Sequence, residues 1–96
     1  MELSEIKDTL ARIRPRLAQQ YGVESLGIFG SYVRRSQRPG SDLDLLVTFR
    51  KPVDLFKFVA LENELSDLLG LKVDLVMKQA LKPRIGQRIL AEVVPV

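Results

Sequence analysis

The sequence lacks two residue types that carry much of enzyme chemistry, because none of its 96 residues is cysteine or histidine. Without cysteine, neither a disulfide framework nor a thiolate metal site can form. Without histidine, a Ser-His-Asp triad, an imidazole zinc site and a histidine general base are all excluded. Any bound metal must therefore have oxygen ligands, which favours Mg²⁺, Mn²⁺ or Ca²⁺.

Long hydrophobic runs are also missing. No apolar stretch approaches the roughly 18–20 residues that span a bilayer, and the first residues lack the basic-then-apolar pattern of a signal peptide. We therefore expect a soluble, cytoplasmic protein without membrane contact. With 46% hydrophobic and 28% charged residues, the chain is predicted to form one domain over residues 1–96. The formal charge of +3 suits a phosphate-bearing or acidic partner but does not identify one.

The spacing of apolar residues near the N-terminus predicts a helix. Steps of three and four residues over positions 3–17 indicate an amphipathic helix with Ser4 as a candidate N-cap and Gly22 as the C-cap. Pro15 either divides this segment into two helices or kinks a single one.

Strands and helices are predicted to alternate along the remaining chain. The expected strands are Ser25–Phe29, Leu43–Phe49, Lys72–Met77 and a short edge strand within Val93–Val96. The expected helices are one turn over Tyr32–Arg35, a helix from the N-cap Asp54 to about Leu69, and a last helix opened by Pro83 with Ile85, Ile89 and Leu90 on its buried face. This order predicts an α+β (or two-layer α/β) fold, with helices packed on a small mixed sheet of three to four strands.

Two carboxylates stand at the start of the clearest predicted strand. Side chains alternate across a strand, so Asp42 and Asp44 project from one face while Leu43 and Leu45 project from the other. At that spacing the two Cα atoms lie roughly 6.5–7 Å apart, so both side chains can reach one metal ion or two neighbouring ones. Two ionised carboxylates this close repel each other unless a cation lies between them. The pair therefore indicates a divalent metal site.

Asp74 repeats the same pattern on the next predicted strand, where it faces away from Val73 and Leu75. If that strand lies beside the strand of Asp44, Asp74 can complete a cluster of three carboxylates. Taken alone, Asp74 could equally be a turn or cap residue.

Gly30 and Ser31 follow a buried strand and precede the predicted helical turn. Glycine lets a phosphate approach the backbone closely, and Ser31 offers a hydroxyl and an N–H near a helix N-terminus, where anions are favoured. As an isolated pair they are better explained by an ordinary turn. They form neither a P-loop nor a Rossmann fingerprint.

The combination of these pieces resembles a known signature. Gly30-Ser31, ten intervening residues and Asp42-x-Asp44 are similar to the Gly-Ser-x10-Asp-x-Asp motif of the polymerase-β-like nucleotidyltransferase superfamily. The runs 27–34 and 41–49 resemble the minimal nucleotidyltransferase (MNT) domain family, and the resemblance extends over nearly the whole chain. Arg35 departs from the pattern, because the family often has glycine after the arginine.

The resemblance implies a fold, a reaction and roles for the motif residues. The fold would be that of polymerase-β-like nucleotidyltransferases, and the reaction would move a nucleoside monophosphate, AMP if ATP is the substrate. Two metal ions, Mg²⁺ or alternatively Mn²⁺, would stabilise the attacking and leaving oxygens. The implied triphosphate contacts are Gly30 and Ser31, and the implied catalytic metal ligands are Asp42, Asp44 and Asp74.

Three arginines, Arg34, Arg35 and Arg38, make the segment before Asp42 basic. Arg34 is a candidate triphosphate contact, although a surface position or an ion pair with one of the carboxylates explains it equally well. The segment as a whole could contact a partner or nucleic acid, or simply be solvated. Phe56 and Phe58 could stack on a base, but their helical spacing favours a place in the core.

The resemblance also implies a partner. MNT proteins are typically paired with a HEPN-domain toxin, which they neutralise by attaching AMP to a tyrosine near its active site. The chain could instead block such a partner by contact alone, or modify a small molecule. Direct binding of nucleic acid is not expected, because it rests on net charge and leaves the three aspartates unexplained.

Overall fold

A four-stranded mixed sheet organises the chain, and the computed structural model describes all 96 residues around it. Its strands are β1 (Val23–Phe29), β2 (Leu43–Phe49), β3 (Val73–Met77) and β4 (Val94–Pro95), in the order β3-β2-β1-β4. The β2–β3 pair is parallel, whereas β1 pairs antiparallel with both β2 and β4. The predicted mixed sheet is thus confirmed, and the predicted C-terminal edge strand forms its fourth member.

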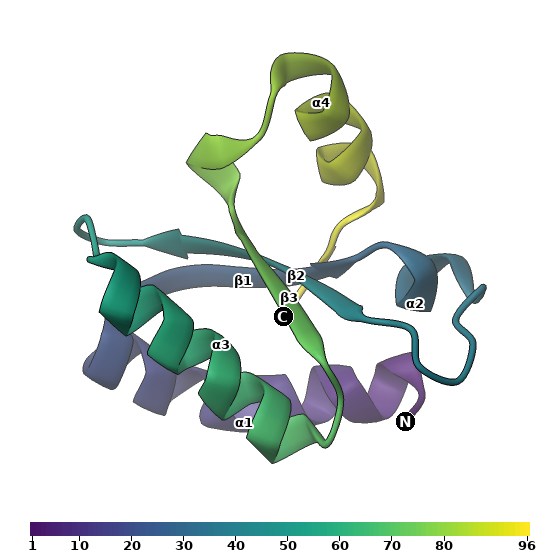
Figure 1. The fold of residues 1–96 in the computed structure, drawn as a ribbon, viewed down its shortest axis with the longest axis horizontal. Coiled ribbons are helices and arrows are strands. Elements are labelled where there is room, and N and C mark those ends of the chain that lie inside the picture. The colour runs from purple at the N-terminus through teal and green to yellow at the C-terminus, as the bar shows by residue number, and fades with distance from the viewer.

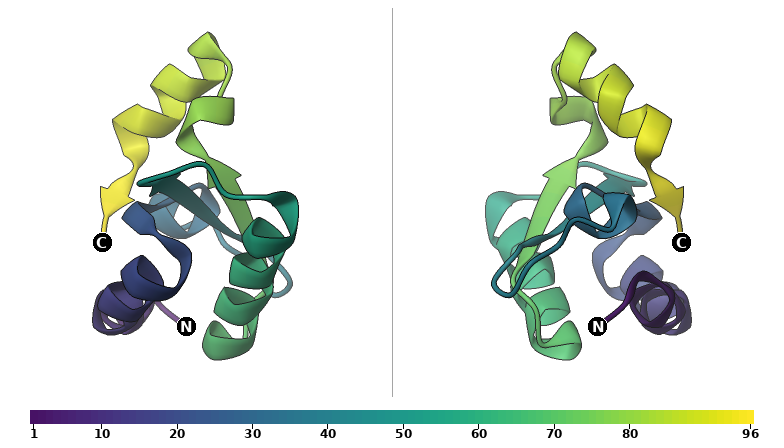
Figure 2. Two further views of the ribbon diagram at one scale, coloured as in Figure 1. Left: turned by 90° about the vertical axis from the view of Figure 1, so that its left-hand side faces the viewer. Right: turned by 90° about the vertical axis from the view of Figure 1, so that its right-hand side faces the viewer.

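Helices cover the two faces of this sheet unequally. The chain forms α1 (Leu3–Tyr21), α2 (Ser31–Arg34), α3 (Leu55–Leu69) and α4 (Pro83–Glu92), with a 3-10 turn, η1 (Lys78–Ala80), before α4. Helices α1 and α3 lie next to each other against one face, while α4 lies over the opposite face (Figure 1, Figure 2). Because a parallel pair needs a crossover connection, α3 joins β2 to β3.

The core lies between the sheet and the helices α1 and α3. Leu43, Leu45 and Val47 of β2 are all fully buried there, as the alternating pattern predicts. They pack in one cluster with residues from both helices, among them Ile6, Leu10, Leu17, Leu61, Leu65 and Leu69. A shift of β2 by one residue would turn this apolar row towards the other face. Core packing therefore directs Asp44 towards the α4 side of the sheet.

Helix α1 is a single helix that contains Pro15. Its N-cap is Glu2, not the predicted Ser4, because Glu2 and Glu5 form a reciprocal capping box. The helix passes through Pro15 because Leu10 and Leu17, on either side of it, are both fully buried against the core. The predicted C-cap, Gly22, is confirmed.

The predicted buried face of α4 is wrong. Ile85 and Leu90 are 55% and 45% exposed, and Ile89 is only partly buried. Helical spacing identifies an apolar stripe, but a neighbouring element must lie over that stripe to bury it. No element of the chain covers this stripe fully, so much of it stays in contact with solvent.

The interpretation of Phe56 as a core residue is also wrong, because its side chain is 87% exposed in the first turn of α3. Phe58 does pack against the core, and its ring meets that of Phe49 edge to face with centroids 6.4 Å apart. The two phenylalanines therefore lie on different sides of the same helix.

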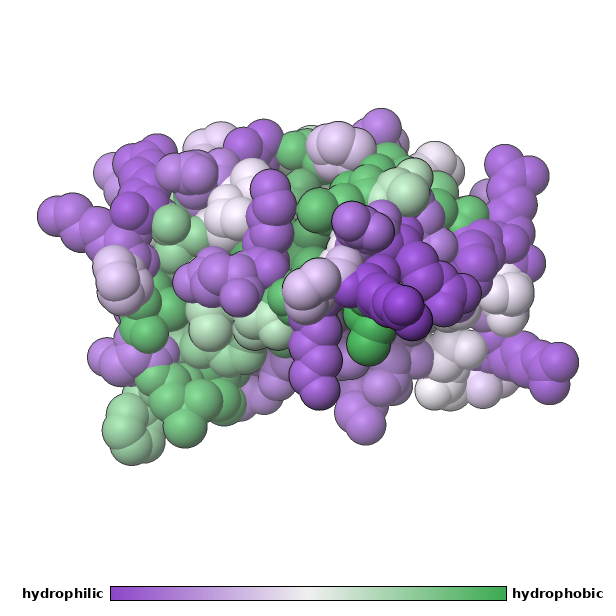
Figure 3. All heavy atoms as spheres, turned by 90° about the horizontal axis from the view of Figure 1, so that it is seen from above, coloured by the Kyte–Doolittle hydropathy of each residue, from purple (hydrophilic) through white to green (hydrophobic).

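The surface on the α4 side is mostly hydrophilic, with apolar patches between the polar side chains (Figure 3). No helix combines the length and apolarity needed to cross a membrane.

Candidate functional site

The turn between β1 and α2 lies directly against the start of β2. Gly30 adopts a positive φ of 81°, which favours glycine, and its carbonyl accepts hydrogen bonds from the N–H groups of Val33 and Arg34. A Cβ atom at position 30 would overlap the carboxylate of Asp44. Both the positive φ and the lack of space for a side chain therefore favour glycine at this position. The turn and Asp44 lie in direct contact, although they are separated in the sequence. Ser31 is the partly buried first residue of α2.

Asp44 and Asp74 are direct partners in the parallel register of β2 and β3, and Phe29 of β1 pairs with Asp44 on its other side. Partial burial raises the pKa of the Asp44 carboxyl, and the negative charges of Asp74 and Asp42 raise it further. The charge of Arg34 opposes this effect. The three aspartates thus concentrate negative charge at one edge of the sheet, where a cation is favoured.

Asp42 precedes β2, and its carboxylate lies 3.9 Å from the ammonium group of Lys72. Both side chains are substantially exposed, so this ion pair contributes little stability. As the side chains lie, no three acidic groups of the chain are gathered closely enough to hold one ion together. The backbone brings the aspartates to the same edge, but closing them around a metal requires side-chain rotation, which the exposure of Asp42 and Asp74 allows. An all-carboxylate set suits Mg²⁺.

Arg34 pairs with Glu92, a residue that the sequence interpretation did not single out. One guanidinium nitrogen lies 3.0 and 3.1 Å from the two carboxylate oxygens of Glu92. The backbone N–H of Gly30 also donates to Glu92, at 2.9 Å. The expected alternative of an ion pair with one of the three aspartates is therefore wrong. No local pattern identifies this role for Glu92, because an acidic residue in the last turn of a helix opposes the helix dipole only weakly and is common at exposed positions.

These groups line a hollow of about 430 Å³ between the sheet and α4. Gly30, Arg34 and Asp44 form the wall on the side of the sheet, and Ile85, Arg88 and Glu92 form the wall on the side of α4. The volume lies within the range of small-molecule sites, roughly 300–1,000 Å³. The hollow thus combines a close-approach turn, two cationic side chains (Arg34 and Arg88) and two carboxylates (Asp44 and Glu92).

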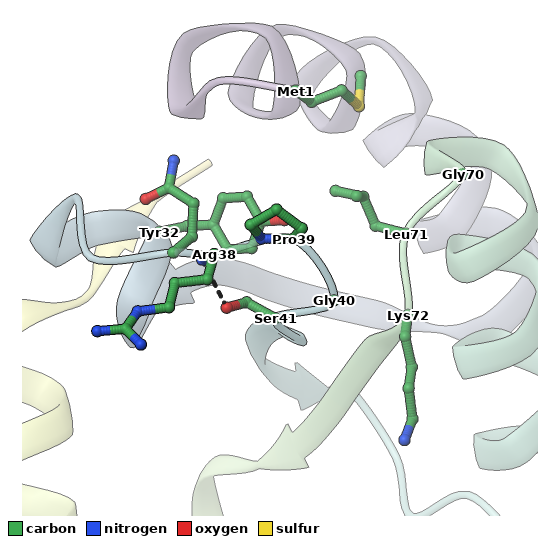
Figure 4. Close-up of a pocket in the computed structure, with 10 residues that line it drawn as sticks. Met1, Tyr32, Arg38, Pro39, Gly40, Ser41, Gly70, Leu71 and Lys72 are labelled. Atoms are coloured by element: carbon green, nitrogen blue, oxygen red, sulfur yellow. Dashed lines mark hydrogen bonds between the residues drawn. The ribbon is translucent and has the colours of Figure 1, made fainter.

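A second hollow, of about 480 Å³, lies between the loop over residues 37–41 and the turn over residues 70–72 (Figure 4). In this loop the Ser41 hydroxyl accepts a hydrogen bond from the Arg38 N–H at 2.8 Å. Neither Gly30 nor any of the three aspartates lines it. The hollow beneath α4 is lined by Gly30 and by Asp44, the one of the three aspartates that borders it, and is therefore the better candidate site.

Known proteins resemble this chain over most of its length. The profile of the nucleotidyltransferase domain family matches residues 10–95. A relative from Thermococcus cleftensis, named protein adenylyltransferase MntA, is 46% identical over 94 residues, which cover 98% of this chain and 95% of the relative. A protein from Methanocaldococcus jannaschii, provisionally named a protein adenylyltransferase, is 52% identical over 80 residues, or 83% of this chain and 82% of the relative.

Solved structures share the fold. A protein provisionally identified as a minimal nucleotidyltransferase superposes with a TM-score of 0.84 at 33% identity, covering 100% of this chain and 97% of that one. A toxin–antitoxin structure with AMP-PNP superposes with a TM-score of 0.76 at 21% identity, and the match covers 93% of this chain and 70% of that one. A chain from the complex of a tri-AMPylated HEPN toxin from Shewanella oneidensis with an MNT antitoxin superposes with a TM-score of 0.67 at 20% identity. That match covers 94% of this chain and 70% of the other.

The toxin–antitoxin structure and the toxin complex are too distant in sequence to show more than a shared fold. The family profile and the relatives, in contrast, extend over the Gly30-Ser31 turn and all three aspartates. This chain therefore belongs to the nucleotidyltransferase domain family.

Proposed function

We propose that this chain, with residues 1–96 acting as one catalytic domain, transfers AMP from ATP to a hydroxyl group of a protein. The acceptor would be a tyrosine of a HEPN-domain toxin, which the transfer inactivates. The observation that carries the proposal is the contact between the Gly30 turn and Asp44, beside Asp74 in the neighbouring strand. Support for a protein acceptor comes from the relative named protein adenylyltransferase MntA and from the fold shared with the AMPylated toxin complex.

Several groups of this chain would bind the triphosphate. The N–H of Gly30 and the guanidinium of Arg34 both face the hollow beneath α4, and Ser31 follows directly in the same turn. An N–H and a planar guanidinium are well suited to phosphate oxygens. Arg88 contributes a further positive charge from α4. These contacts would orient the α-phosphate towards the aspartates.

Asp42, Asp44 and Asp74 would hold Mg²⁺, which fits their all-oxygen chemistry and the unfavourable concentration of negative charge around Asp44. When bound, the metal supplies positive charge to the transferred phosphate and the leaving oxygen. Asp44 lies between the fully buried Leu43 and Leu45 of the same strand, so it would provide a rigidly held ligand.

The reaction itself balances simply. The acceptor oxygen forms a bond to the α-phosphorus of ATP, and the bond from that phosphorus to the bridging oxygen of the β-phosphate breaks. Pyrophosphate leaves with the electron pair of the broken bond. The exposed carboxylate of Asp74 would accept the proton from the acceptor hydroxyl and pass it to water.

The test is transfer of label from α-labelled ATP, with Mg²⁺, to the protein that co-purifies with this chain. We expect the wild type to label its partner and Asp42→Asn/Asp44→Asn to lose roughly a hundredfold or more of the rate. Mass spectrometry of the labelled peptide identifies the acceptor residue. Asp67→Asn, an exposed aspartate on α3, is the matched control and should retain full activity.

Two outcomes would contradict the proposal. Wild type that transfers no label, or a double variant that transfers as much as the wild type, would remove the catalytic role of the aspartates. If the double variant still neutralised the partner completely, the chain would act by contact alone.

A further inference from the structure

The carboxylate of Glu92 occupies the position at which the nucleotide site presents its anion-binding groups. It accepts the Gly30 N–H at 2.9 Å and pairs with the Arg34 guanidinium through both of its oxygens, at 3.0 and 3.1 Å. Gly30 and Arg34 belong to the motif end of the chain, 62 and 58 residues away from Glu92. The contact is thus tertiary and joins α4 to the β1–α2 turn.

A carboxylate and a phosphate present the same features to these donors, namely anionic oxygens that accept charge-assisted hydrogen bonds. An N–H group has one hydrogen and is directed at one acceptor. A phosphate that bonds to the Gly30 N–H must therefore replace Glu92 there. The two anions would also repel each other if both stayed beside Arg34.

The local setting of Glu92 does not explain its position. It is the last residue of α4, where the helix dipole disfavours a negative charge. The other acidic residue that lines the hollow is Asp44, whose negative charge adds further repulsion. Its side chain is 26% exposed and borders a hollow of about 430 Å³, so it has room to rotate away. The Gly30 N–H and Arg34 are the contacts that hold it.

We propose that Glu92 is an internal counter-ion of the nucleotide site: it occupies a phosphate position in the free protein, and the triphosphate displaces it. This inference rests on the proposed function, because it takes ATP as the displacing ligand. Glu92 then lowers the affinity for nucleotide, because binding must first break its contacts with Gly30 and Arg34. Displacement also frees the side chain at the end of α4 whenever nucleotide is bound.

The direct test compares the dissociation constants of wild type and Glu92→Gln for Mg²⁺-ATP by calorimetry. Glutamine keeps the size and an acceptor oxygen but loses the charge, so it competes less well. We expect Glu92→Gln to bind Mg²⁺-ATP about three- to tenfold more tightly and to lower KM for ATP.

Glu64→Gln is a matched control. Glu64 also pairs with an arginine guanidinium, that of Arg16, at 3.1 Å, and its side chain is 26% exposed like that of Glu92. It lies on α3, away from the hollow, so its variant should bind ATP as the wild type does. Glu92→Asp is the second site variant. It keeps the charge but is one methylene too short for all three contacts, so it should also bind ATP more tightly than wild type.

Removing Arg34 provides an independent check. Competition predicts that Arg34→Gln weakens ATP binding more in the Glu92→Gln background than in the wild type, where Arg34 must first leave its partner. Weaker or unchanged binding in both Glu92 variants would overturn the inference and would make Glu92 a support for Arg34. Thermal melts of each variant verify that it is folded.

Inorganic triphosphate separates this inference from the proposed function. It carries the phosphates without the nucleoside or any group to transfer. If Glu92→Gln binds triphosphate more tightly but ATP is never transferred, the internal counter-ion stands and the transferase proposal fails. If ATP is transferred but neither ligand binds the variant more tightly, the reverse holds.

Discussion

At the scale of single residues, Arg35 is under backbone strain. It ends α2 with a φ of 56°, and it is the one residue other than glycine with a positive φ. The left-handed region costs a residue with a Cβ roughly 1–2 kcal/mol. This explains why the related motif often has glycine at this position. Arg35 makes no side-chain hydrogen bond or ion pair that would compensate.

We expect Arg35→Gly to stabilise the protein by up to about 1 kcal/mol, because the relief of strain exceeds the roughly 0.5–1 kcal/mol of backbone entropy that glycine loses on folding. A gain of that size raises Tm by about 4–8 °C in a domain of this length. Arg38→Gly, in the same loop but with a negative φ, is the control and should not be stabilised. Equal changes in Tm for the two variants would rule out strain at Arg35.

At the scale of elements, the pairing of β2 with β3 assembles the charged part of the site. The parallel register sets Asp44 beside Asp74, and Leu45 beside Leu75 on the opposite face. The buried leucines hold the two strands together, and the same alternation places the two carboxylates next to each other. Burial and the neighbouring charges then raise the pKa of Asp44, so that its ionised form is less favourable in the folded protein than in the unfolded chain.

Two thermal shifts follow from this pairing. Asp44→Asn should raise Tm of the metal-free protein near neutral pH by a few degrees, because it removes one of the repelling charges. MgCl₂ should raise Tm of the wild type by more than that of Asp44→Asn, because a ligand that binds only the folded state stabilises it. Asp67→Asn serves as the control for general effects of charge.

Scanning fluorimetry with and without MgCl₂ measures both shifts. A wild type whose Tm does not respond to Mg²⁺, or an Asp44→Asn variant that responds equally, would argue against a metal site at this edge.

At the scale of the whole molecule, the apolar core and the candidate site lie on opposite faces of the sheet. The face towards α1 and α3 carries the apolar core, while the face towards α4 carries Asp44, Asp74 and the hollow. Helix α4 covers this second face incompletely, which leaves Ile85 and Leu90 exposed and the hollow open. Neighbouring residues of one strand, such as Asp44 and Leu45, therefore serve different purposes.

This separation predicts unequal costs of truncation. Leu45→Ala should lower the free energy of unfolding by about 2–5 kcal/mol, because it leaves a cavity in a fully buried position. Leu90→Ala on α4, which is 45% exposed, should cost roughly 0.5 kcal/mol or less. Urea denaturation with an unchanged m-value measures both. Equal losses would mean that α4 belongs to the core.

Much of the fold and part of the site could be predicted from local pattern. Strand β2 was predicted with its observed ends, because Leu43–Phe49 is a short, largely apolar run in which Leu43, Leu45 and Val47 share one face. Leu46, on the other face, is buried as well. The N-cap Asp54 of α3 and its end at Leu69 were likewise predicted from short-range chemistry. The spacing from Gly30-Ser31 to Asp42-x-Asp44 indicated the family, because it resembles the Gly-Ser-x10-Asp-x-Asp motif of nucleotidyltransferases.

The sequence by itself thus determined most of the elements and the buried face of β2, because these depend on periodicity and local hydrogen bonding. Only the tertiary structure decided that α4 leaves its apolar stripe exposed and that Asp44 pairs with Asp74. It also decided that Glu92 bonds to the N–H of Gly30 and to the guanidinium of Arg34. These features join segments far apart in the chain. Their partners are selected by packing over the whole sheet, which no local pattern records.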